Sequence, residues 1–219
     1  MTSKQRFEAT VFTTSAYREE ARWLLIEEAN RVARDLQLPE KLPITQADLL
    51  ETYISTPRVS QMLGTFGTVT TSNYTYCVSV ANRFSFLTKR NLEADYAKLK
   101  AQYLWPMSRL DTNAAFQLAT QLLCAASMDV KALQRDCDVI IRACTPEGPA
   151  GKHFVPIYWI TWKGKRREEI GRGAAVELFE PTKQLRQLHV LNPEYILRKR
   201  LELHNLGNLL SQTNAPSVP

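Results

Sequence analysis

The feature that most constrains the fold is a dense apolar segment at residues 154–162, with the sequence FVPIYWITW. Nearly every position is β-branched or aromatic, a composition that favours a strand whose two faces are both covered by other parts of the protein. A charged segment with three glycines at 163–173 separates it from a second apolar run at 174–180. This arrangement predicts a long hairpin at the centre of an antiparallel sheet, with a further strand at 184–190.

Hydrophobic periodicity predicts the remaining elements. A three-and-four spacing of apolar residues indicates amphipathic helices, of which the one at 112–127 is nearly all apolar. Alternation of Tyr74, Tyr76 and Val78 with small or polar residues indicates a strand with one buried face. The elements predicted outside the hairpin are helices at 15–37, 46–53, 92–104 and 112–127 and strands at 66–72, 74–88 and 136–145.

These elements repeat in order, because each half of the chain has a long helix followed by antiparallel strands. We therefore predict an α+β protein with two related lobes, each a helix packed on an antiparallel β-meander. The boundaries expected from the sequence are 1–108 for the first lobe with a connecting helix, 109–204 for the second lobe and 205–219 for a tail. The arrangement is typical of an internal duplication.

The second half resembles the PepSY-like repeats of exported bacterial proteins. The resemblance lies in the helix opening at 112–119, TNAAFQLA, and in the strand, turn and strand at 176–185, VELFEPTKQL. It implies an exported, non-catalytic domain that binds or inhibits another protein, and it brings no catalytic residues with it. A periplasmic or secreted location is favoured if Met1 is an added start residue.

The charge is basic but evenly spread. The formal net charge is +6, and residues 1–110 and 111–219 each hold 14 basic and 11 acidic side chains, so each half carries +3. An even distribution argues against a dedicated nucleic-acid face, although it permits weak attraction for anions. No apolar run approaches the roughly 20 residues that a membrane-spanning helix needs, so no membrane span is expected.

The sequence contains no recognisable catalytic, cofactor or metal motif. The four cysteines have no zinc-type spacing, and buried free thiols are favoured over a disulfide. The three histidines are scattered, without a ligand-type spacing. We therefore expect a protein that is not an enzyme and holds no cofactor or metal. An enzyme of an unrecognised type is the third hypothesis, after the two binding hypotheses below.

The candidate binding residues combine tryptophans with a run of cations. The favoured hypothesis is recognition of a protein or peptide partner. The alternative is a nucleic-acid-binding module, because cations interleaved with aromatic rings suit phosphate and base contact. Sheet packing for the tryptophans and solvated loop charge for the cations are the structural alternatives. The candidate residues are Trp159, Trp162, Lys163, Lys165, Arg166 and Arg167.

Overall fold

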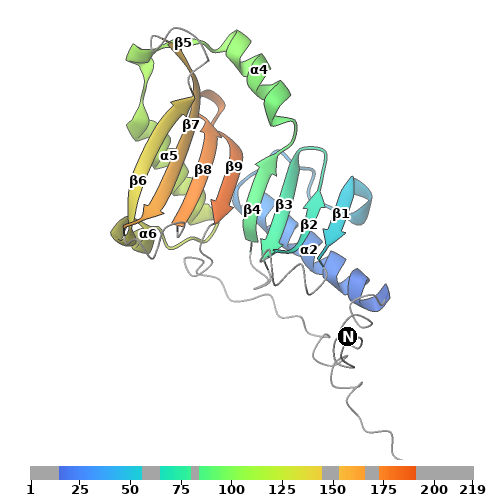
Figure 1. Ribbon diagram of the computed structural model, residues 1–219. Coiled ribbons are helices and arrows are strands. Elements are labelled where there is room, and N and C mark those ends of the chain that lie inside the picture. The colour runs from blue at the N-terminus through green and yellow to red at the C-terminus, as the bar shows by residue number, and fades with distance from the viewer. Residues whose placement is uncertain (1–14, 56–64, 80–83, 145–152, 166–172, 191–219) are drawn as a thin grey trace, which may run out of the picture.

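The computed structural model (Figure 1) describes residues 15–55, 65–79, 84–144, 153–165 and 173–190. Within these residues the chain forms four α-helices and one nine-stranded antiparallel sheet. The predicted α+β class is therefore confirmed. The expected tail at 205–219 and the candidate residues Arg166 and Arg167 lie outside the described residues.

The elements follow one another along the chain as a helix and strands, then a connecting helix, then helices and strands again. The helices are α2 (Ser15–Asp35), α4 (Leu92–Gln102), α5 (Thr112–Ala125) and α6 (Val130–Asp136). The strands of the first half are β1 (Glu51–Ile54), β2 (Thr65–Thr70), β3 (Tyr74–Ser79) and β4 (Phe84–Lys89). Those of the second half are β5 (Trp105–Pro106), β6 (Cys137–Cys144), β7 (His153–Gly164), β8 (Gly173–Phe179) and β9 (Gln184–Val190).

The two halves share a single sheet. The strand order is β1-β2-β3-β4-β9-β8-β7-β5, with β6 also paired to β7. Each half is a simple meander, and the last strand of one half pairs antiparallel with the last strand of the other, Leu87 of β4 lying opposite Leu188 of β9. The helix-plus-meander pattern of each half is thus present, but the sheet runs on through both halves instead of dividing into separate lobes.

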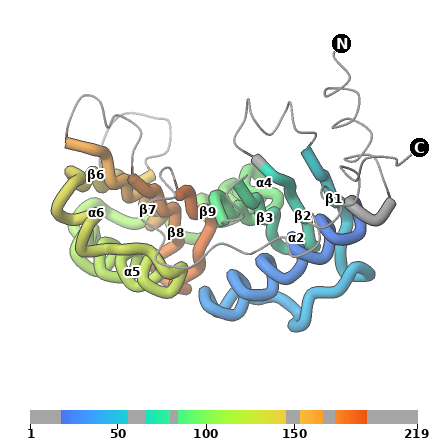
Figure 2. The backbone as a smooth tube through the Cα atoms, turned by 90° about the horizontal axis from the view of Figure 1, so that it is seen from below, coloured from blue at the N-terminus to red at the C-terminus, as the bar shows by residue number. Residues whose placement is uncertain are grey.

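The helices α2 and α5 cover the same face of this sheet (Figure 2). On this helix-covered face Phe116 of α5 stacks on Trp162 of β7, with ring centroids 6.0 Å apart. Leu25 of α2 packs so closely on Gly67 of β2 that a Cβ atom there would lie 2.9 Å from it. Buried apolar side chains of both halves form one hydrophobic cluster, and burial of this kind is the main stabilising term for the fold.

The connecting helix α4 packs on the opposite face, at one end of the second half's strands (Figure 1). There Leu99 joins Val155, Ile157 and Phe179 in a second buried cluster. Tyr103, just after α4, meets Phe179 edge to face with centroids 5.1 Å apart. We call the sheet face opposite α2 and α5 the open face, because α4 covers only this end of it.

Three sequence predictions differ from the structure. The helix expected at 46–53 is a single 3-10 turn, Gln46–Asp48, followed by β1. Asp48 accepts hydrogen bonds from the Thr45 backbone and hydroxyl, which closes the turn locally. The strand expected at 74–88 is two strands, β3 and β4, and the helix α6 was not expected.

Pro156 lies within β7 at an irregularity of the ladder with β6. The register there passes from Ala143 opposite Tyr158 to Cys144 opposite Val155. Because proline has no backbone N–H to donate, a bulge accommodates it inside an otherwise paired strand. Within the described part of the chain, no helix has the length and apolar character needed to span a membrane.

Candidate binding face of the sheet

The two candidate tryptophans lie on opposite faces of β7. They are three positions apart, and side chains alternate between the two faces of a strand, so the two indoles point to opposite sides of the sheet. Trp162 points to the helix-covered face and is 0% exposed. Trp159 is half-buried on the open face. Of the two, only Trp159 is accessible to a ligand.

Trp159 belongs to a row of three rings from three strands. His189 of β9 lies edge-on to Trp159 at 5.7 Å between centroids, and Phe86 of β4 lies edge-on to His189 at 4.3 Å. Phe86 and His189 are directly opposed in the ladder, while β8 separates His189 from Trp159. Ala175, opposite His189 on β8, is small enough for the rings to meet above it. We call Trp159, His189 and Phe86 the aromatic platform.

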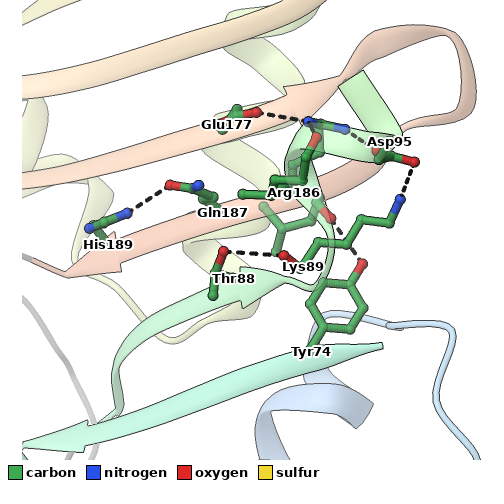
Figure 3. A network of polar contacts seen from close by, with 10 residues as sticks. Tyr74, Thr88, Lys89, Asp95, Glu177, Arg186, Gln187 and His189 are labelled. Atoms are coloured by element: carbon green, nitrogen blue, oxygen red, sulfur yellow. Dashed lines mark hydrogen bonds and ion pairs between the residues drawn. The ribbon is translucent and has the colours of Figure 1, made fainter. Parts of the chain in front are cut away.

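The aromatic platform is uncharged at neutral pH. Burial lowers the pKa of His189 below its ordinary value of 6.5, because desolvation disfavours the imidazolium form. The Nε2 atom of His189 lies 3.1 Å from Oε1 of Gln187 (Figure 3). A neutral imidazole between two rings therefore presents an apolar surface with a polar edge at Gln187.

The candidate cations are not gathered on this platform. Lys163 is exposed on the same face and the same strand as Trp159. Lys165 is exposed, and its Nζ donates a hydrogen bond to the carbonyl of Arg135 at 2.7 Å, at the end of α6. The structure thus brings Trp159 and Lys163 onto one face, places Trp162 in the core and directs Lys165 toward α6.

A buried arginine closes the end of the open face that α4 covers. Arg186 of β9 is 2% exposed and forms an ion pair with Asp95 of α4. Its Nε donates to Glu177 of β8 at 2.7 Å, and Lys89 of β4 pairs with the other oxygen of Asp95 at 2.6 Å (Figure 3). The network fastens α4 to strands of both halves. Its charges are satisfied internally, so we assign it to structure and not to ligand binding.

A second polar cluster surrounds Glu40 beside α2. Glu40 accepts hydrogen bonds from the hydroxyl of Thr71 at 2.6 Å and from that of Tyr76 at 3.0 Å, and from the amide of Asn73 at 3.1 Å. Burial, followed by the charge of Glu40, raises the pKa of Tyr76 above its ordinary value. The phenol therefore stays protonated and serves as a hydrogen-bond donor, which does not suit it to act as a base.

The described residues include four cysteines and two histidines that could in principle serve metal binding or redox chemistry. No group of three or more His, Cys, Asp or Glu side chains within the described ranges is placed to hold a metal ion. None of the four cysteines is assigned to a disulfide. Cys77 and Cys137 are buried as expected, whereas Cys144 is half-buried and Cys124 is exposed on α5.

Sequence reasoning missed two of the three platform residues. Nothing in the sequence singles out His189 among the scattered histidines, and strict alternation along 74–88 would put Phe86 on the same face as Tyr74 and Tyr76. The irregularity between Cys77 and Val78, which changes the register against β4, puts Phe86 on the open face instead. A bulge of this kind leaves no clear signal in the sequence.

No family model, curated protein or solved structure matches this chain.

Proposed function

We propose that this protein is a non-catalytic binding protein that recognises a protein or peptide partner through the aromatic platform. The observation that carries the proposal is the placement of Trp159, His189 and Phe86 in mutual contact on the face that α2 and α5 leave open (Figure 2). Aromatic rings provide large contact areas at a low cost in side-chain entropy, and they dominate the energetics of many interfaces.

The chemistry of the surrounding face favours an apolar segment of a protein as the ligand. The neutral platform suits apolar side chains, while the exposed Lys163 beside it suits a carboxylate on the same segment. A polyanion such as nucleic acid fits less well, because the exposed acids Glu51 and Asp138 share this face with Lys163 and Arg142. Nucleic-acid binding depends on an accumulated positive field, which mixed charge does not provide.

The proposal extends to the origin of the fold. We propose that residues 1–108 and 109–204 are two related units that arose by internal duplication. The support is topological: α2 with β1–β4 and α5–α6 with β6–β9 are each helical segments followed by a four-strand meander. A close superposition of the two helix-plus-meander units would support the duplication, and different strand orders around the helices would contradict it. The PepSY-like resemblance and the extracytoplasmic location that it implies stay predictions.

The binding proposal can be tested by selecting peptides from a random-sequence display library on the full-length protein and measuring their affinities by calorimetry. Peptides rich in apolar residues should be enriched. Their affinity should fall about tenfold or more for Trp159→Ala, as expected for an aromatic interface anchor. Trp23→Ala is the matched control, since Trp23 is 59% exposed on α2, away from the platform, and it should bind as the unaltered protein does.

Two outcomes would contradict the proposal. Selected peptides that bind Trp159→Ala and the unaltered protein equally well would exclude the aromatic platform as the binding site. Salt-dependent binding of a short single-stranded oligonucleotide, lost in Trp159→Ala and Lys163→Ala, would favour the nucleic-acid alternative instead.

A further inference from the structure

The strand β6 forms one edge of the sheet, and its outer side has no partner strand among the described residues. It pairs only with β7. Its central residues are apolar and accessible, Val139 being 37% and Ile140 36% exposed. Proteins commonly protect edges by shortening the strand or by placing lysine or proline on it. The opposite edge, β1, is only four residues long, whereas β6 has eight residues with neither lysine nor proline.

The sequence of β6 is complementary to itself when it is reversed. With Ile140 opposite its own counterpart in an antiparallel pair, Asp138 lies opposite Arg142 on the open face. In the same register Val139 lies opposite Ile141 on the other face. Each of these pairs occurs twice about a two-fold axis. We propose that β6 pairs with β6 of a second copy of this chain in this register, forming a homodimer with one continuous sheet.

The observed register within one chain strengthens the charge argument. Asp138 lies opposite Lys163 of β7, and Arg142 lies opposite Trp159 of β7. In the dimer each Asp138 is therefore flanked by its own Lys163 and by the partner's Arg142. Each Arg142 gains a carboxylate beside an aromatic face. Both charged side chains of the strand are exposed in the single chain, and no ion pair of either is present among the described residues.

Neighbouring registers do not offer this match. Sliding the partner strand by two residues in one direction places Asp138 opposite Ile140, and sliding it in the other direction places Asp138 opposite Cys144. In both arrangements the carboxylate of Asp138 has no cation directly across the ladder. Opposite charges directly across an antiparallel pair stabilise it, and like charges destabilise it. The proposed register is therefore the one that the side chains of β6 select.

The proposed strand pairing also determines on which side of the dimer the two open faces lie. An antiparallel pair about a two-fold axis perpendicular to the sheet keeps the open faces of both copies on one side. The two β7 strands are then separated by three strand spacings, roughly 14 Å. If the aromatic platform binds a partner as proposed above, the dimer presents two platforms side by side. The dimer itself does not depend on that function.

Sedimentation equilibrium of the full-length protein tests the proposal by charge exchange. The unaltered protein should show a concentration-dependent dimer. Asp138→Arg and Arg142→Asp should each raise the dimer dissociation constant about tenfold or more, because both symmetric ion pairs become repulsive. The double variant, and an equimolar mixture of the two single variants, should restore the dimer. Glu93→Arg and Lys98→Asp, exposed on α4, change the net charge equally and should dimerise normally.

A purely monomeric unaltered protein, single variants that dimerise normally, or a mixture that stays monomeric would each overturn the proposal. A cysteine cross-link provides a second test that does not depend on charge. In a Cys124→Ser background, Ile140→Cys should form a covalent dimer on mild oxidation, because facing Cα atoms in an antiparallel pair are within disulfide range. Efficient cross-linking of Val139→Cys in place of Ile140→Cys would contradict the register.

Discussion

The two faces of β7 each carry a tryptophan, but the two tryptophans have different surroundings. Trp162 is enclosed between the sheet and α5, where it stacks on Phe116. Trp159, on the same strand, lies on the open face against His189. The difference shows that the role of a tryptophan in this protein is set by which layer covers its face. Residue type alone does not determine it, because the position in β7 sets the face and the layer over that face sets the role.

The largest effect that can test this comparison is expected at Trp162. Replacing it with alanine removes a fully buried indole and should lower the free energy of unfolding by about 3–5 kcal/mol. Urea denaturation followed by circular dichroism measures the change. A loss below about 1 kcal/mol would mean that the face assignment is wrong.

Trp162→Phe is the matched control for that substitution. The indole Nε1 of Trp162 is buried without a hydrogen-bond partner among the described residues. Phenylalanine removes this unsatisfied donor and keeps an aromatic ring against Phe116. The smaller ring lowers the free energy of unfolding, whereas removal of the unpaired N–H group raises it, so the two effects partly cancel. The cost should be well below that of Trp162→Ala. Equal costs for both variants would indicate that the Nε1 atom has a partner.

The next largest effect is expected at Arg186, where α4 covers the open face. Arg186→Met leaves Asp95 and Glu177 facing each other with only Lys89 to offset their charge. Breaking a buried ion pair from one side costs about 3–5 kcal/mol, and the partial exposure of both carboxylates places the expected loss nearer 2–4 kcal/mol. Urea denaturation measures it, with the exposed Lys98→Met as a control that also removes one positive charge.

Neutralising Glu177 should restore part of that stability. Adding Glu177→Gln to Arg186→Met removes the carboxylate that is left without a cation, while Lys89 still pairs with Asp95, so the double variant should be more stable than Arg186→Met alone. A double variant that is less stable would mean that hydrogen bonding by the Glu177 carboxylate, and not charge balance, holds α4 in place.

Much of the local structure could be predicted from the sequence, because it depends on local signals. The strand expected at 184–190 is β9, and the helix expected at 112–127 is α5, which Asp111 caps by accepting a hydrogen bond from the Ala114 backbone at 2.9 Å. The pairing of β4 with β9 could not be predicted in this way. It joins segments far apart in the chain, and it alone brings Phe86 to His189.

The burial of Arg186 could not be predicted from the sequence for a similar reason. A register shift between Glu177 and Leu178 displaces the β8–β9 ladder beside Arg186, and α4 then supplies Asp95 from a distant part of the sequence. An arginine between Leu185 and Gln187 of a strand gives no indication of either event. The candidate site could therefore be predicted only as far as Trp159 and Lys163, the members that lie on one strand.

A smaller effect on stability is expected at Trp159. Its ring is half-buried and packs on the open face, so Trp159→Ala should reduce the free energy of unfolding by about 1 kcal/mol, well below the loss for Trp162→Ala. Thermal and urea denaturation of both variants under identical conditions measure the contrast. Equal losses at the two positions would remove the distinction between a covered and an open face, and with it the argument for a platform.

The smallest effect is expected from protonation of His189. Because burial lowers its pKa in the folded state, the unfolded chain binds the proton more readily as the pH falls through the ordinary value of 6.5. The stability associated with neutral His189 is therefore complete above that value and is lost as the pH falls toward the folded-state pKa. Between about pH 7.5 and pH 5.5, the melting temperature of the unaltered protein should fall more than that of His189→Gln. Identical slopes for the two proteins would show that the imidazole is as well solvated in the folded state as in the unfolded chain, so that the platform is open water-exposed surface at its centre.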